Sequence, residues 1–237
     1  MMQSPTSINT YLQCPRKYSN KYIKRLPTKE TAEMQVGTLT HEVLAEFVSG
    51  DDYSMERLLK IFECRCNANK ISLLKSQHFS DIKVMLENWF ESVRRIARDQ
   101  GMAKYFEGLK PEVKLKSEEY NVCGVLDLVN EDNGYIVEYK TSSKDIIKQE
   151  YKLQLGIYAL LFLENLKRLP EKLSINFLKH GEKEVLVTHE VLNEAKKICK
   201  LIRLKTLSRN IEDYPCKKSP LCKWNKGQCE FYLECLK

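Results

Sequence analysis

The sequence predicts an α/β or α+β fold in which a largely helical N-terminal part precedes a small sheet and a cysteine-rich tail. Apolar residues recur at helical spacing through the first hundred residues, whereas residues 112–141 alternate between apolar and polar like strands. The chain has 237 residues, of which 43% are hydrophobic and 30% charged. This balance excludes global disorder, and the length suits one large domain or two small ones.

Four helices are expected in the N-terminal part. The clearest covers 37–48, where Leu39, Val43, Leu44 and Phe47 recur on one helix face. The expected ranges are 4–13, 37–48, 54–66 and 79–100.

Three strands are expected next. Val113 and Leu115 alternate with charged residues, and 122–129 is a nearly continuous apolar run. The pair Asn133–Gly134 is a strong hairpin signal, because both residues accept a positive φ. Residues 135–140 then return as the third strand.

The remaining chain reads as helix, strands, helix and tail. A helix is expected over about 149–167, followed by strands near 173–178 and 184–188. A last helix is expected over 191–207, before an irregular tail that is rich in cysteine. This element order is typical of an α/β or α+β core with a helical cap.

Composition also limits the setting in which the chain works. The net charge of +7 permits a polyanionic partner, but the basic residues are scattered, so charge alone is weak support for nucleic acid. The longest apolar stretch, near 159–163, is far shorter than the ~20 residues that span a bilayer. The first residues also lack the pattern of a secretory signal. We therefore expect an intracellular, cytoplasmic protein without a membrane partner.

Two carboxylates and a lysine are expected to converge on the hairpin. If Asn133–Gly134 is a two-residue loop, Asp127 lies directly opposite Lys140 and Glu138 lies opposite Val129. The three charged side chains then share one face, with opposite Cβ atoms about 4.5–5.5 Å apart.

This arrangement suits metal-dependent phosphodiester cleavage. Carboxylate oxygens, with the backbone carbonyl of Tyr139, are hard ligands for Mg²⁺ or Mn²⁺. Lys140 could orient or deprotonate the attacking water. The alternative is a salt bridge on a solvated face. We favour the metal site, because an aspartate inside the apolar run VCGVLDLV needs a reason.

Three further polar residues could belong to the same site. Gln154 and Tyr158 are four residues apart, so they share one face of the helix that follows the hairpin. They could hold a lysine, a phosphate or a base, although a boundary glutamine and a core tyrosine would look the same. His41 lies on an otherwise apolar helix face in GTLTHEVL. Such a histidine is more often a boundary residue, but beside two carboxylates it could bind a metal.

The cysteines indicate a metal centre rather than disulfides. Four of the nine, Cys216, Cys222, Cys229 and Cys235, lie in the last 22 residues, and Cys14 stands in YLQCPRKY. Four thiolates could hold a [4Fe–4S] cluster or Zn²⁺. The tail could supply all four ligands, or Cys14 could join three of them. We expect the other four, Cys64, Cys66, Cys123 and Cys199, to act as small buried hydrophobes.

Taken in order, the segments resemble the PD-(D/E)XK nuclease superfamily in its RecB-like, iron–sulfur branch. The segments are SPTSINTYLQCPRKY, GTLTHEVL, GVLDLV, IVEYKTS, QLGIYALL and the cysteine tail, so the resemblance runs from Ser4 to Cys235. That branch includes AddB- and RecB-type nuclease domains, CRISPR-associated iron–sulfur nucleases and phage exonucleases. The resemblance implies an α/β, restriction-endonuclease-like core with a central mixed sheet flanked by helices, an N-terminal helical region and an Fe–S tail.

The resemblance also implies domain limits and residue roles. A single nuclease domain would span 1–237, with a mainly helical part (1–110), a catalytic core (111–190) and a C-terminal helix and cluster tail (191–237). The metal ligands would be His41, Asp127 and Glu138, Lys140 would be the catalytic lysine, and Gln154 and Tyr158 would support it and contact DNA.

For the [4Fe–4S] cluster, the resemblance implies Cys14, Cys222, Cys229 and Cys235 as ligands. The family's tail usually runs C-x2-C-x5-C, but Asn225 to Gln228 stand here like a four-residue insertion between Cys222 and Cys229. Cys216 could therefore replace Cys222.

The expected function is a metal-dependent DNA nuclease, and most simply an exonuclease acting on single strands or DNA ends. The chain itself has no GxxxxGK[ST] helicase motif. It would therefore act alone, as a homo-oligomer, or with a helicase or recombination partner, in replication, recombination, repair or CRISPR adaptation. The compact chain also fits a phage or viral enzyme. The alternatives are a catalytically silent DNA-end-binding module that kept its metal cluster, and a zinc-stabilised scaffold.

Overall fold

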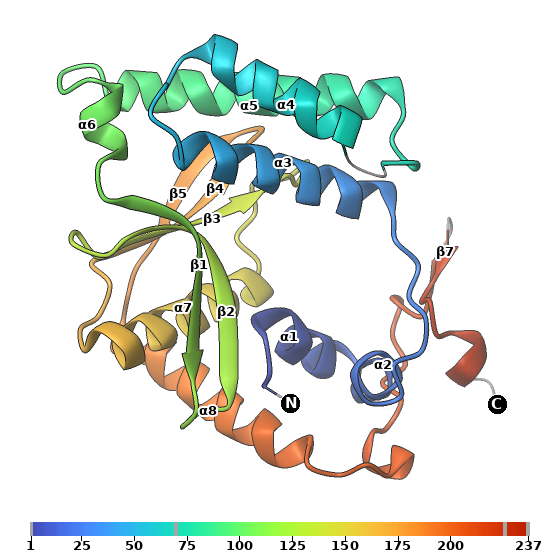
Figure 1. The fold of residues 1–237 in the computed structure, drawn as a ribbon. Coiled ribbons are helices and arrows are strands. Elements are labelled where there is room, and N and C mark those ends of the chain that lie inside the picture. The colour runs from blue at the N-terminus through green and yellow to red at the C-terminus, as the bar shows by residue number, and fades with distance from the viewer. Residues whose placement is uncertain (1, 69–70, 225–226, 236–237) are drawn as a thin grey trace.

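The chain folds around a five-stranded mixed sheet with helices on both faces (Figure 1), which confirms the predicted α/β class. The computed structural model describes residues 2–68, 71–224 and 227–235. The strand order is β1-β2-β3-β4-β5, and only the β3–β4 pair is parallel. The strands are β1 (Leu109–Ser117), β2 (Val122–Asn130), β3 (Tyr135–Lys140), β4 (Lys172–Phe177) and β5 (Gly181–Val185).

The predicted helices are present, with some shifted ends. The N-terminal helices are α1 (Pro5–Gln13), α2 (Pro15–Tyr18), α3 (Ala32–Val48), α4 (Met55–Ala68), α5 (Ser76–Ile96) and α6 (Met102–Phe106). The sheet is followed by α7 (Gln149–Leu166) after β3 and α8 (His189–Lys205) after β5. A π-helical turn (Ser19–Ile23) continues α2, and the tail adds two short strands, β6 (Lys223–Trp224) and β7 (Gly227–Gln228). No helix in the described part of the chain is long and apolar enough to cross a bilayer.

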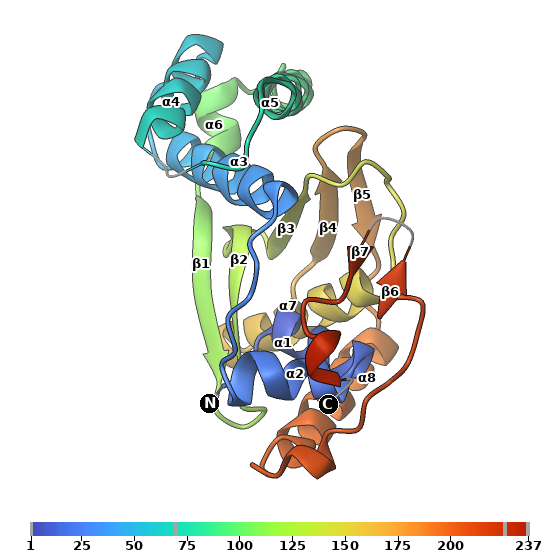
Figure 2. The same cartoon turned by 90° about the vertical axis from the view of Figure 1, so that its right-hand side faces the viewer.

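One helical layer, made by α3 to α6, covers the face of the sheet that is uppermost in Figure 1 and Figure 2. Its core is aromatic, because Phe47 of α3 makes edge contacts with Trp89, Phe90 and Phe106 at centroid distances of 5.7, 6.0 and 5.8 Å. This upper cluster reaches the sheet through Tyr139 of β3. It thereby fixes α3, the helix that carries His41, against the strands.

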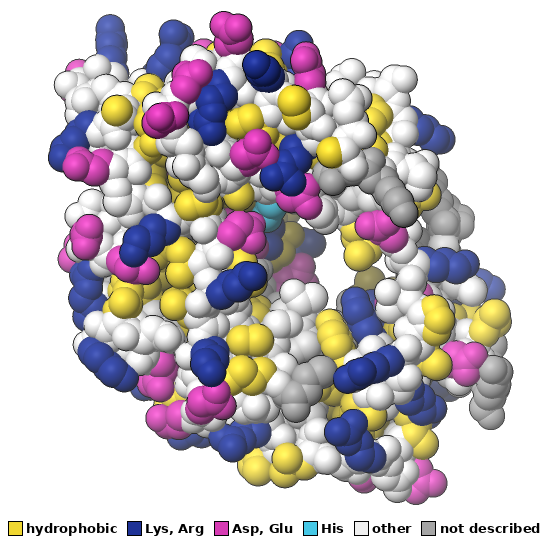
Figure 3. All heavy atoms as spheres, in the orientation of Figure 1, with side chains coloured by type: hydrophobic (Ala, Val, Ile, Leu, Met, Phe, Trp, Pro, Cys, Tyr) yellow, Lys and Arg dark blue, Asp and Glu magenta, His cyan; other side chains and the backbone are white. Residues whose placement is uncertain are grey.

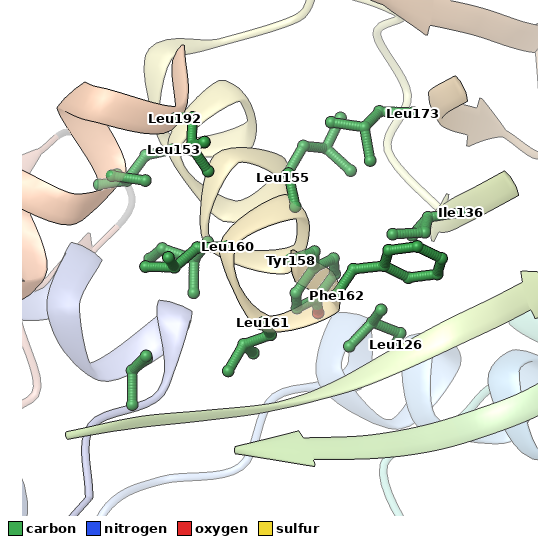
Figure 4. Packing of buried hydrophobic residues seen from close by; sticks show 14 of the residues in the cluster. Leu126, Ile136, Leu153, Leu155, Tyr158, Leu160, Leu161, Phe162, Leu173 and Leu192 are labelled. Carbon is green, nitrogen blue, oxygen red and sulfur yellow. The ribbon is translucent and has the colours of Figure 1, made fainter. Parts of the chain in front are cut away.

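The opposite face of the sheet packs on α7, which is apolar on nearly all sides because α8 covers its far face. Figure 4 shows α7 surrounded by Leu126 of β2, Ile136 of β3 and Leu192 of α8. Gly156 permits this close approach, because a Cβ there would lie 3.1 Å from Val191 Cγ1. The buried helix therefore has a fixed rotation, and its Gln154 and Tyr158 point toward the strands.

The β2–β3 hairpin corrects the predicted register. Leu128 pairs with Val137 and Asn130 pairs with Tyr135, so each residue is paired two positions away from the prediction. The loop has four residues rather than two, and tertiary contacts close it: the Asn130 side chain accepts from the Asn133 N–H, and Arg168 donates to the loop carbonyls. A shift of two keeps every side chain on its predicted face.

The two ends of the chain meet beside α8, as Figure 2 shows. Tyr18 stacks on Tyr214 with ring centroids 6.2 Å apart, and Arg16 Nε donates to the Tyr214 carbonyl at 2.8 Å. These contacts hold Cys14, between α1 and α2, next to the cysteine tail.

Candidate active site

Asp127 is the centre of a cluster that joins β2, β3 and α3. It is a buried carboxylate, 9% exposed, whose two oxygens take different partners. Oδ1 lies 3.2 Å from His41 Nδ1, and Oδ2 accepts the backbone N–H of Tyr139 at 2.7 Å. The Tyr139 ring is anchored in the upper cluster beside Trp89, which fixes the backbone whose carbonyl is the predicted ligand.

Glu138 and Lys140 form a second part of the site with residues of α7. Lys140 Nζ donates to Glu138 Oε1 at 2.6 Å and to Gln154 Oε1 at 3.0 Å. Gln154 Nε2 donates to the same Glu138 oxygen at 2.8 Å and to the Tyr158 hydroxyl at 2.9 Å. The ammonium also lies 4.9 Å from the centre of the Tyr151 ring. The lysine is therefore held from three directions.

Tyr158 connects this network to the backbone of β2. Its hydroxyl donates to the Val125 carbonyl at 2.9 Å. The ring fits because Gly124 has no side chain: a Cβ there would lie 3.0 Å from Tyr158 Cε1 and 3.0 Å from Leu161 Cδ1. This glycine, on the same strand as Asp127, thus makes room for a polar contact that orients Gln154.

The other oxygen of Glu138, Oε2, is buried and has no hydrogen-bond partner among the described residues. Burial, and then the negative charge of Asp127, raise the pKa of Glu138 to about 7, against the lowering effect of Lys140. At His41, burial opposes protonation, but the charge of Asp127 and the hydrogen bond to it raise the pKa of the imidazole. Both groups thus sit in an excess of buried negative charge that a cation would neutralise.

The donor set fits a hard divalent cation. Carboxylate oxygens and an imidazole nitrogen converge, and one buried carboxylate oxygen is unpartnered among the described residues. Mg²⁺ and Mn²⁺ prefer such oxygen-rich ligands.

Glu112 is a member of this cluster that the sequence pattern did not reveal. An oxygen of its carboxylate, an oxygen of Asp127 and a ring nitrogen of His41 all lie within 4.8 Å of one another. Burial and the neighbouring charge of Asp127 raise the pKa of Glu112. In the sequence, Glu112 is simply a polar position of an alternating strand, which predicts only exposure to solvent.

The cysteines of the two chain ends line one hollow of about 890 Å³, formed by Cys14, Cys216, Cys222, Cys229 and Cys235. Strands β6 and β7 form a hairpin in which the Cys229 N–H donates to the Cys222 carbonyl at 2.9 Å. Burial, then a hydrogen bond and charge from Cys216, and the charges of Cys14 and Cys229, raise the pKa of Cys235 to about 11. Cys216 and Cys222, the two candidates for the fourth ligand, therefore line the same hollow.

The hairpin gives the insertion a structural context. The last two residues of the insertion, Gly227 and Gln228, pair with Trp224 and Lys223. The first two, Asn225 and Lys226, lie outside the described residues. Cys222 and Cys229 flank the two pairing strands. The extra residues therefore lengthen the hairpin but leave these two cysteines next to each other at its base.

The remaining cysteines match the expectation of small buried hydrophobes only in part. Cys199 is buried in α8, Cys66 and Cys123 are half-buried, and Cys64 is exposed on α4. The prediction of a buried Cys64 is wrong, because the helix face that Cys64 occupies is turned away from the upper cluster.

A mixed sheet that brings buried carboxylates, a histidine and an anchored lysine together is the framework of a metal-dependent hydrolase. The family model of the PD-(D/E)XK nuclease superfamily matches residues 3–235. The chain therefore belongs to this superfamily, whose nucleases use divalent metals and act on DNA.

A solved structure supports the fold. Eight chains of known structure match significantly, and one is a candidate exonuclease from Eubacterium rectale. It aligns with a TM-score of 0.57 at 15% sequence identity, over 98% of this chain and 92% of that chain. Among curated protein sequences, none matches significantly. At this identity the likeness concerns the fold alone.

Proposed function

We propose that this protein is a Mg²⁺- or Mn²⁺-dependent deoxyribonuclease that works as an exonuclease on single-stranded DNA or DNA ends. One observation carries the proposal: Lys140 is fixed beside a buried carboxylate, Glu138, whose second oxygen has no partner among the described residues. A salt bridge kept only for stability would leave neither an unpartnered buried oxygen nor a second carboxylate, Asp127, beside it.

The roles of the residues follow from their contacts. His41, Asp127, Glu138 and the Tyr139 carbonyl would hold the cation, which supplies an acidified water and screening of the phosphate. Lys140 orients or deprotonates the attacking water and stabilises the charge that develops on the phosphate.

Two residues of α7 act through the lysine. Gln154 accepts from Lys140 and donates to Glu138, so it sets the distance between these two groups. Tyr158 holds the Gln154 amide and is itself anchored on the Val125 carbonyl. We assign both residues to positioning Lys140 and the DNA.

A basic hollow supports a single strand or a DNA end as the substrate. The cavity beside the cysteine tail also carries six lysines: Lys17, Lys21, Lys29, Lys217, Lys218 and Lys223. Figure 3 shows an opening between the upper helical layer and the lower half of the molecule, with both basic and acidic side chains around it. Lysines along a groove neutralise phosphates, so we expect DNA affinity to fall steeply with added salt.

We further propose that the cysteines bind a [4Fe–4S] cluster and that the chain is a member of the RecB-like iron–sulfur branch. Cys14, Cys222, Cys229 and Cys235 would be the ligands, with Cys216 as the alternative to Cys222. The single hollow that contains all five thiols supports this assignment. The cluster would tie the N-terminal helices to the tail, so that residues 1–237 act as one nuclease domain.

The decisive experiment compares wild type with Lys140→Ala on 5′- and 3′-labelled single- and double-stranded DNA. We expect cleavage that requires Mg²⁺ or Mn²⁺ and disappears in the variant, while DNA binding persists. The ladders give the polarity and separate exonuclease from endonuclease action. A folded, cluster-loaded wild type that binds DNA ends but never cleaves them would support the silent end-binding module instead.

The cluster has a separate test. Purified protein should absorb near 400 nm, as iron–sulfur proteins do and zinc proteins do not, and Cys229→Ser should lose both the colour and folded yield. Cys64→Ser is the matched control, because Cys64 is exposed on α4 outside the hollow. A colourless Cys229→Ser protein with full yield and activity would contradict a structural cluster.

A further inference from the structure

Glu112 has a backbone conformation that a strand residue rarely adopts. Its φ is +53°, in the left-handed region that favours glycine. Pro111 pairs with Leu128 and Val113 pairs with Leu126, so the register places Glu112 across from Asp127, where the ladder is interrupted. This backbone conformation costs free energy. It interrupts the β1–β2 pairing at Glu112, whose carboxylate lies beside Asp127.

The resulting arrangement concentrates negative charge. Oxygens of Glu112 and Asp127 lie within 4.8 Å of each other and of a His41 ring nitrogen. Among the described residues, no salt bridge or hydrogen bond reaches the Glu112 carboxylate. Next to Asp127, the buried Oε2 of Glu138 is likewise unpartnered within the described part of the chain. Neighbouring carboxylates repel each other unless a cation lies between them.

We propose that Glu112 is a cation ligand of the DNA-free protein. Together with His41 and Asp127 it would bind a divalent ion, and a phosphate of the substrate would then replace Glu112 on that ion. The inference rests on the proposed function and adds a residue to it. Glu112 is the exposed member of the three, so it is the ligand that an incoming phosphate can reach.

The coordination number explains why Glu112 would leave. Mg²⁺ takes about six ligands in an octahedral arrangement. His41, Asp127, Glu138 and the Tyr139 carbonyl would fill four places, and hydrolysis would need the last two for water and a phosphate oxygen. Glu112 can therefore occupy a place only while the phosphate is absent.

The test is Mn²⁺ binding to the full, cluster-loaded chain without DNA, followed by electron paramagnetic resonance. We expect Glu112→Gln to weaken Mn²⁺ binding at least tenfold and Asp127→Asn to weaken it more. Glu118→Gln is the matched control, because Glu118 is exposed at the β1–β2 turn and pairs with Lys116. It should bind Mn²⁺ like wild type.

The two proposals fail in different ways. Wild-type Mn²⁺ affinity in Glu112→Gln, together with a loss in Asp127→Asn, overturns the role of Glu112 and leaves the nuclease site intact. Wild-type affinity in both variants overturns the metal site itself.

A second variant distinguishes the loss of a metal ligand from a loss of folding stability. Glu112→Gly removes the carboxylate but accepts a positive φ without strain. We expect a higher melting temperature than wild type together with weaker Mn²⁺ binding, because the strain is relieved and the ligand is lost. A Glu112→Gly protein with full Mn²⁺ affinity would refute the proposal.

The displacement step has its own measurement. In a Lys140→Ala background, which leaves the DNA uncut, Glu112→Gln should bind single-stranded DNA two- to tenfold more tightly in Mn²⁺, since no carboxylate competes with the phosphate. Weaker DNA binding would show instead that Glu112 stays on the ion when the substrate is bound, which contradicts its displacement.

Discussion

Replacing Gln154 with leucine should release Lys140 from its catalytic position while leaving the cation ligands in place. The amide makes three contacts: it accepts from Lys140 at 3.0 Å and donates to Glu138 at 2.8 Å and to Tyr158 at 2.9 Å. Leucine is close to glutamine in size. The substitution therefore removes hydrogen bonds without opening a large cavity.

The expected magnitude follows from these contacts. Hydrogen bonds to charged groups contribute about 1.5–3 kcal/mol each, and neutral ones about 0.5–1.5 kcal/mol. All three partners keep another contact: Lys140 and Glu138 keep each other at 2.6 Å, and Tyr158 keeps the Val125 carbonyl. We therefore expect a stability loss of about 2–3 kcal/mol. A lysine displaced by about 1 Å should lower kcat about 100-fold.

Urea unfolding gives the stability term, and single-turnover cleavage of labelled DNA with Mn²⁺ gives the rate. The matched control is Gln149→Leu at the start of the same helix, where the side chain donates to Glu194 on the surface. It should change neither quantity appreciably. If Gln154→Leu cleaves DNA as fast as wild type, the amide does not position Lys140, and the reasoning from this network is wrong.

Three further predictions concern the same site. Gly124→Ala should destabilise the protein by about 1–3 kcal/mol and slow cleavage, because its Cβ would meet the Tyr158 ring at 3.0 Å; a thermal shift assay checks the first part. Tyr151→Leu should lower kcat about two- to fivefold, because it removes the contact of the Tyr151 ring with Lys140, which contributes about 0.5–1 kcal/mol; Tyr151→Phe should keep that contact and the wild-type kcat. In EDTA, unfolding free energy should fall as the pH rises from 4.5 to about 7, because the raised pKa of Glu138 means that the folded state holds the extra proton over this range. Glu138→Gln should flatten that slope, and an unchanged slope would argue against the raised pKa.

Long amphipathic helices could be predicted from sequence because their apolar period repeats several times. The helix predicted over 37–48 begins five residues earlier, at Ala32, where the first turn has no clear apolar period. Its start is set by Thr31, whose side chain accepts the Met34 N–H. The short helices α2 and α6 were not predicted, because four or five residues cannot display a period of 3.6.

The hairpin shows which part of a site can be predicted from local sequence. Side-chain alternation correctly brought Asp127, Glu138 and Lys140 into one region, since it depends only on strand parity. The register was wrong by two, because the loop length is decided by Arg168, which lies 35 residues beyond Asn133 and donates to the loop carbonyls. A turn motif of two residues cannot predict a contact with a residue so distant in the sequence.

Glu112 could not be predicted for a related reason. Alternation assigns a residue to a face on the assumption that the strand is regular, and Glu112 breaks the strand with a φ of +53°. Neither Pro111 before it nor Val113 after it signals that conformation. Only the pairing of β1 with β2 puts the carboxylate beside Asp127.

The site lies between two hydrophobic clusters, and this position affects stability as well as chemistry. His41 comes from α3 in the upper layer, and Gln154 comes from α7 in the lower layer, with Asp127 and Glu138 on the strands between them. Buried carboxylates at this boundary are costly without a cation. In the proposed metal-bound enzyme the ion joins α3 to the sheet, and a ligand at 100 times its Kd adds about 2.7 kcal/mol to folding stability. Metal should therefore protect α3 from hydrogen exchange more than it protects α8, which lies beyond α7.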